Sequence, residues 1–170
     1  MQPRRIAREK ALQFLYQYET NRPDNIEEAL QTFWDSQRMS AAMKNVKGPT
    51  YGQEIELPPL TTKDATIRHF AENLIQGAIE YATESDADIE RHTQNWAMSR
   101  IAKVDRCILR LAVFEIRHRD DIPPIVSINE AVDLAKKYST EKSGQFVNGI
   151  LDKVKNECSQ PDRSPDHSSS

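Results

Sequence analysis

The chain has 170 residues and a formal net charge of −3, with 38% apolar and 29% charged residues. This length favours a single domain, and the composition is that of a soluble globular protein rather than a disordered or fibrous one. No apolar run approaches the roughly 20 residues that a membrane span needs, and the N-terminal sequence MQPRRIAREK lacks the apolar stretch of a signal peptide. Cys107 and Cys158 are too few for a disulfide scaffold or a four-ligand zinc site. We therefore expect a cytoplasmic protein.

Apolar residues repeat with helical spacing along almost the whole chain, and no stretch alternates with the period of a strand. We expect five helices over residues 4–20, 25–44, 67–82, 104–116 and 142–157, the second of them capped by Asp24. Two more helices are expected to start at their own caps, one at Ser85 and one at a capping box of Ser127 and Glu130. Glycine and proline predict an irregular connector at 45–62, and the polar residues 159–170 predict a disordered tail after a domain that spans 1–158. The fold class is therefore all-α, a single-domain bundle of about seven helices.

A basic cluster opens the chain. Arg4 and Arg8 are four residues apart and share a helix face, with Arg5 beside them. Arginine forks onto two oxygens of a phosphate, so this stripe suits an RNA or DNA backbone. The alternative is an ordinary solvated helix face. Taken by itself, the basic cluster favours this alternative over nucleic-acid binding. Tyr16 could stack on a base, but it falls on the apolar stripe and is expected in the core.

A second unusual run lies near the C-terminus, where Phe146 and Asn148 precede Gly149 inside a predicted helix. Glycine costs a helix about 1 kcal/mol relative to alanine, so something should approach its backbone closely. That neighbour is either another helix or a ligand. An exposed phenylalanine beside an amide would suit single-stranded RNA, through stacking and hydrogen bonding to a base edge.

Catalytic motifs are missing from the sequence. There is no GxGxxG or Walker loop, and no pair of histidines stands four residues apart. Asp86 and Asp88 form a DxD motif that could bind Mg²⁺, but acidic residues in a first helical turn also stabilise the helix dipole. An enzyme is therefore the weak hypothesis, and we predict no cofactor and no metal.

Four segments carry a family resemblance: RRIAREKALQFLY at 4–16, VDRCILRLAVFEI at 104–116, VSINEAVDLAKKY at 126–138 and FVNGILD at 146–152. Together they resemble the NusB family of bacterial transcription antitermination factors. The resemblance implies two three-helix halves plus an extra helix. It also implies binding of the boxA segment of ribosomal RNA leader transcripts together with NusE, a small-subunit ribosomal protein, so that RNA polymerase reads through terminators. A similar domain precedes a ribosomal RNA cytosine methyltransferase, but this chain ends before a SAM-binding domain could begin.

Two sets of site residues follow. For RNA, we expect Arg4, Arg5 and Arg8 to contact phosphates, Phe146 and Asn148 to contact a base, and Lys142 to assist; Lys142 stands in a stretch that is often acidic in the family. For the protein partner, we expect a surface on the helix over 104–116, made of Asp105, Arg106, Leu109, Arg110 and Phe114. Phe114 could instead complete the core. The rival function is a purely protein-binding helical scaffold without RNA affinity.

Overall fold

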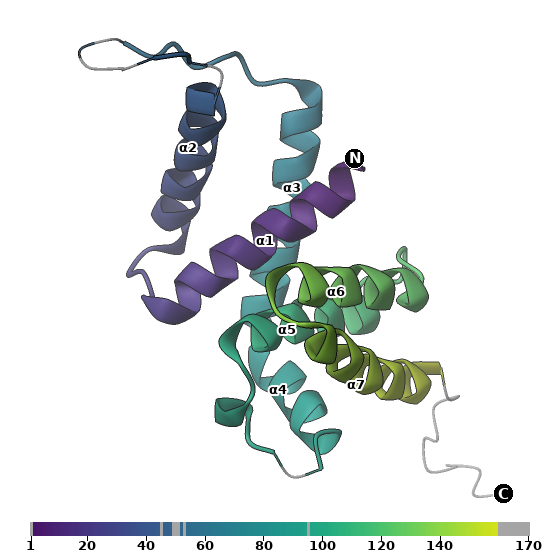
Figure 1. Ribbon diagram of the computed structural model, residues 1–170. Coiled ribbons are helices and arrows are strands. Elements are labelled where there is room, and N and C mark those ends of the chain that lie inside the picture. The colour runs from purple at the N-terminus through teal and green to yellow at the C-terminus, as the bar shows by residue number, and fades with distance from the viewer. Residues whose placement is uncertain (1, 45, 49–51, 53, 95, 160–170) are drawn as a thin grey trace, which may run out of the picture.

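The computed structural model describes residues 2–44, 46–48, 52, 54–94 and 96–159, and within them the chain forms seven α-helices, one short 3₁₀ turn and no strand (Figure 1). The helices are α1 (Pro3–Thr20), α2 (Ile26–Lys44), α3 (Thr62–Glu80), α4 (Ala82–Arg91), α5 (Lys103–His118), α6 (Pro124–Tyr138) and α7 (Glu141–Ser159), with the 3₁₀ turn at Met98–Arg100. The predicted all-α class is confirmed. The described connector residues 46–48, 52 and 54–61 contain no helix, and residues 160–170 of the predicted tail lie outside the described part.

Three of the predicted helix caps are wrong. Asn25 rather than Asp24 caps α2, because its Oδ1 accepts the backbone N–H of Glu28 at 3.1 Å. Ser85 lies within α4, which begins directly after α3 with only Tyr81 between them.

The third wrong cap belongs to α6. This helix begins at Pro124, a residue type suited to the first helical turn because it has no N–H to leave unpaired. Ser127 therefore lies one turn inside the helix, where its hydroxyl donates to Glu115 at 3.1 Å. The helix α3 has the capping box that sequence reasoning did not identify: Thr61 and Asp64 each accept the other's backbone N–H.

The helix α5 is the centre of the bundle, since it packs against α1, α3, α4, α6 and α7. Helices α1 and α3 pack against each other, α5, α6 and α7 contact one another, and α4 packs against α5. In Figure 1, α1 crosses α3, and α2 lies to one side of them, next to the connector. Its side chains reach α1, since the Phe33 and Phe14 ring centres are 5.6 Å apart. Helices α6 and α7 form an extensive contact at the C-terminal end of the chain.

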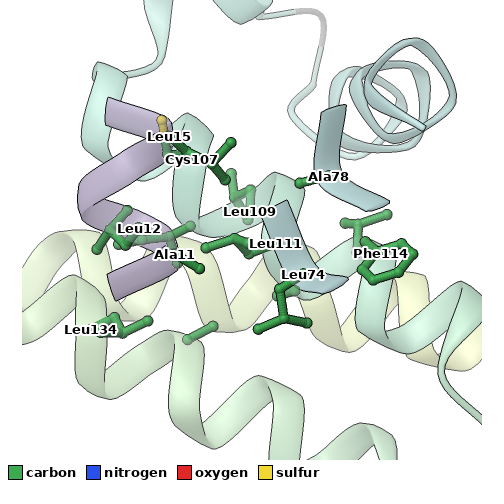
Figure 2. Close-up of a cluster of buried hydrophobic side chains, with 14 of the residues drawn as sticks. Ala11, Leu12, Leu15, Leu74, Ala78, Cys107, Leu109, Leu111, Phe114 and Leu134 are labelled. Atoms are coloured by element: carbon green, nitrogen blue, oxygen red, sulfur yellow. The ribbon is translucent and has the colours of Figure 1, made fainter. Parts of the chain in front are cut away.

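Part of the core forms where α1, α3, α5 and α6 meet (Figure 2), and α7 adds fully buried residues such as Val147 and Leu151. It contains buried aliphatic side chains such as Leu12, Leu74 and Leu109. Gly77 is required here, because a Cβ at this position would lie 2.1 Å from Cζ of Phe114. Burial also raises the pKa of the Cys107 thiol to about 11, so this cysteine is an inert core residue. In the described part of the chain, no helix is both long enough and apolar enough to span a membrane.

Candidate nucleic-acid interface

The prediction that Arg8 lies on an exposed stripe is wrong. Its side chain is only 5% exposed, and its Nη2 donates to Oε1 of Glu115 at 2.7 Å. Positions 7, 8, 11, 12, 14 and 15 of α1 are buried, so the helix turns Arg8 toward the core. Glu115 is buried as well, and a buried carboxylate needs a charged or hydrogen-bonding partner. Arg8 therefore serves the core rather than a phosphate.

Arg4 and Arg5 are exposed, as predicted, but both have acidic partners. Arg5 donates to Glu130 at 3.1 Å and to Asp133 at 2.8 Å, both on α6, and this pairing raises its pKa. Arg4 lies 3.8 Å from Asp121, with its guanidinium carbon 4.8 Å from the centre of the Phe70 ring. A phosphate at either arginine would compete with a carboxylate. Since exposed ion pairs are worth little, that exchange is inexpensive.

The predicted residues of α7 occupy the outer side of the helix. Lys142 and Asn148 are exposed, while Phe146 is partly buried against the core. Gly149 is exposed too, and a Cβ there would meet nothing within 4 Å. Close helix packing within the described chain is therefore not the reason for this glycine. It leaves an open stretch of helix backbone beside Asn148.

Tyr16, which was expected in the core, is exposed, and so is a second large aromatic residue, Trp96. Trp96 is 53% exposed, and its ring centre lies 6.4 Å from that of Phe146. Tyr16 is 44% exposed, and the Lys103 ammonium lies 5.3 Å from its ring centre. The apolar spacing that suggested burial identifies a helix face, but whether another element covers that face depends on the tertiary fold.

Tyr138, at the end of α6, extends this surface and was not among the predicted site residues. Its hydroxyl accepts from the Gln13 side chain at 3.4 Å, and it lines a groove of 540 Å³ together with Tyr16, Lys103 and Val104. Its place at the end of the matched segment 126–138 was the only sequence signal. We call Tyr16, Trp96, Tyr138 and Phe146, with Lys103 and Lys142, the aromatic face.

The first turn of α5 connects the two parts of the aromatic face. Lys103 and Val104 line the groove on one side. On the other side, Asp105 accepts the Ser143 hydroxyl of α7 at 3.0 Å, three residues before Phe146. Exposed aromatic rings beside flexible cations are the combination that binds single-stranded nucleic acid, by stacking on bases and attracting phosphates.

The predicted partner surface on α5 is wrong for three of its five residues. Leu109 and Phe114 are buried in the core, and Asp105 is buried against α7, where desolvation raises its pKa. The alternative that Phe114 completes the core is confirmed. Arg106 and Arg110 are only partly buried. The central position of α5 explains the outcome, since neighbouring helices cover most of its circumference.

Asp86 and Asp88 do not form a joint site. Asp86 accepts two hydrogen bonds from Arg110, at 2.7 and 2.9 Å, while Asp88 binds Arg117 at 2.7 Å. The two carboxylates therefore belong to separate arginine pairs that attach α4 to α5. Structural ion pairing accounts for the DxD motif.

The helical fold and the aromatic face define an all-α protein with a candidate interface for single-stranded nucleic acid. The model of the NusB family matches residues 5–156. The chain therefore belongs to the NusB family.

Curated relatives agree with this assignment. The transcription antitermination protein NusB of Methylacidiphilum infernorum is 41% identical over 151 residues, which is 89% of each chain. NusB of Myxococcus xanthus is 41% identical over 154 residues, 91% of this chain and 95% of the relative.

Solved structures share the fold. T. maritima NusB is 32% identical with a TM-score of 0.68, covering 92% of this chain and 93% of that one. A structure described as the antitermination factors NusB and NusE in complex with dsRNA is 28% identical with a TM-score of 0.67, covering 92% and 98%.

Proposed function

We propose that this chain is a non-enzymatic transcription antitermination factor that binds boxA-like single-stranded RNA of ribosomal RNA leader transcripts. It binds jointly with NusE, a small-subunit ribosomal protein, and helps the RNA polymerase elongation complex read through terminators in the cytoplasm. Membership of the NusB family supports this function, as do the relatives named transcription antitermination protein. A similar chain occurs in a structure of NusB and NusE in complex with dsRNA.

The aromatic face is the observation in this molecule that carries the proposal. Trp96 and Tyr16 are large side chains about half exposed to solvent, and they lie near Phe146 and Lys103 respectively. Exposed large apolar side chains that gather on one surface are typical of an interaction site. Bases stack on Tyr16, Trp96 and Phe146, while Lys103, Lys142, Arg4 and Arg5 attract the phosphates.

The test is a fluorescence anisotropy titration with a U-rich, boxA-like single strand at two salt concentrations, with and without purified NusE. We expect salt-dependent binding that tightens when NusE is present. A strand of the same length with a scrambled sequence serves as the control and should bind more weakly.

The rival function is a protein-binding scaffold without RNA affinity. One observation favours this rival: Arg4, Arg5 and Arg8 each already pair with a carboxylate of the chain, as they would if none of them bound a phosphate. It predicts NusE binding with equal and negligible affinity for both RNA strands, so the same titration separates the two functions.

A further inference from the structure

A pocket separate from the aromatic face lies between α1, α2, α3 and the end of the connector. It has a volume of 240 Å³, and its apolar lining includes Ile6, Trp34, Ala41, Leu60 and Ile67. Leu60 is 61% exposed, so the pocket opens beside an apolar side chain that solvent still reaches. Sites for whole small molecules are usually larger, at roughly 300–1,000 Å³. The size suits one anchoring side chain of a longer ligand.

Cations from three helices surround the pocket: Lys10 of α1, Arg38 of α2 and Arg68 of α3. Arg68 pairs with Glu72 at 3.0 Å. Lys10 donates to the side-chain amide oxygen of Gln37, and Arg38 donates to the backbone carbonyl of Pro58 at 2.7 Å. Within the described part of the chain, neither Lys10 nor Arg38 forms an ion pair with a carboxylate.

The charge of the pocket is therefore incompletely balanced. Asp64 is the one carboxylate in its lining, and it is engaged in capping α3, where it accepts the Thr61 N–H at 2.9 Å. Lys10 is partly buried, and desolvation lowers its pKa. A carboxylate supplied by a ligand would offset the desolvation of the Lys10 ammonium and receive a second contact from Arg38.

We propose that this pocket binds a short acidic peptide segment of a partner protein, which inserts one large apolar side chain beside Trp34 and places its carboxylates against Lys10 and Arg38. A nucleic acid fits the site less well. Trp34 is buried, so it exposes little ring surface for a base to stack on, and the rest of the apolar lining is aliphatic and gives a phosphodiester chain no polar partner.

The test uses the full chain and a fluorescein-labelled peptide, Glu-Asp-Leu-Phe-Glu-Asp-Glu, followed by anisotropy. Ala41→Phe fills the pocket from an exposed position of α2, and Ser40→Phe places the same ring on a neighbouring exposed position outside the lining. Lys10→Gln removes the partly buried ammonium, and Lys153→Gln removes an exposed one on α7. A peptide with lysine in place of each acidic residue controls for charge.

We expect saturable binding of the acidic peptide, abolished by Ala41→Phe and weakened about tenfold by Lys10→Gln, the scale of one charge-assisted hydrogen bond. Ser40→Phe and Lys153→Gln should bind like the parent chain, and the lysine peptide should not bind. The proposal is overturned if the peptide does not bind, or if Lys10→Gln and Lys153→Gln weaken binding equally.

Two further outcomes would assign the pocket to a different occupant and overturn the peptide proposal. In one, boxA-like RNA loses affinity with Ala41→Phe but not with Ser40→Phe. In the other, sedimentation of the free chain shows self-association that Ala41→Phe alone removes, which would make a second copy the occupant. If Ala41→Phe binds RNA with the affinity of the parent chain, the pocket and the proposed RNA site are separate, and the two proposals can fail independently.

Discussion

Arg8 of α1 and Glu115 of α5 form a buried ion pair, with Nη2 and Oε1 2.7 Å apart and the Ser127 hydroxyl donating to the same oxygen. This contact joins the first helix to the central one across 107 residues of sequence. It fixes the arrangement of α1, from which Tyr16 reaches the aromatic face.

Replacing one member of this pair should destabilise the fold strongly. We expect Arg8→Gln to lower the free energy of unfolding by about 3–5 kcal/mol, because it leaves the Glu115 carboxylate buried without its charge partner. The double replacement Arg8→Met with Glu115→Leu should restore much of that loss. Urea unfolding followed by circular dichroism measures both. Parent-like stability of Arg8→Gln together with weakened RNA binding would mean that Arg8 contacts RNA after all.

Gly77 and Phe114 form a second pair that can be tested. A Cβ at residue 77 would lie 2.1 Å from the Phe114 ring, so Gly77→Ala should cost about 1–3 kcal/mol through overpacking. In a double-mutant cycle with Phe114→Leu, the two losses should not add, since the smaller side chain makes room for the methyl group. Strictly additive losses would show that the two positions do not touch.

Arg4 and Arg5 should act on RNA affinity with little effect on stability. For single strands, the slope of log binding constant against log salt concentration changes by about 0.7 per neutralised phosphate. Replacing both arginines with Gln should therefore flatten this slope by roughly 1.4. The melting temperature should move little, because the ion pairs lost are exposed. Lys153→Gln is the matched control. An unchanged slope would remove both arginines from the RNA site.

The Asp121 carboxylate should titrate unusually low. Hydrogen bonds from Arg119, at 3.0 Å to each oxygen, lower its pKa from 3.8 to about 2. Because the pKa in the folded state lies below the unfolded value, the pair stabilises the fold above pH 4, and this contribution is lost as the pH falls toward 2. Carbon-13 NMR of the Asp121 carboxyl group measures the midpoint, and Arg119→Gln should raise it. A midpoint near 3.8 in the parent chain would contradict the pairing.

The helices could be predicted from the sequence because each carries an apolar stripe with helical spacing, as Ile67 to Ala78 do along α3. Their starting points were harder to predict. Ser127 has the residue type of a cap, yet Pro124 starts α6 one turn earlier, and Ser127 instead bonds to Glu115. Side-chain partners distant in sequence override local capping preferences.

The candidate site was predictable only in part, for the same physical reason. Lys142 and Asn148 are exposed as their polar character suggests, whereas Arg8 is buried because Glu115, far away in sequence, is its partner. Tyr16 and Trp96 have the apolar character of core residues, but no element of the described chain covers enough of them to bury them. Residue type alone does not reveal which faces the tertiary fold leaves open.

The most direct test of the proposed RNA function is the affinity of Tyr16→Ala, Trp96→Ala and Phe146→Ala for a boxA-like single strand, measured by anisotropy beside thermal melts. Each change should cost about 1–3 kcal/mol of binding, the range for a base stacked on an aromatic ring. Ile125→Ala, at another exposed apolar residue, should bind RNA like the parent chain. A triple variant of the three aromatic positions that stays folded and binds RNA as tightly as the parent chain would contradict the assignment of the aromatic face.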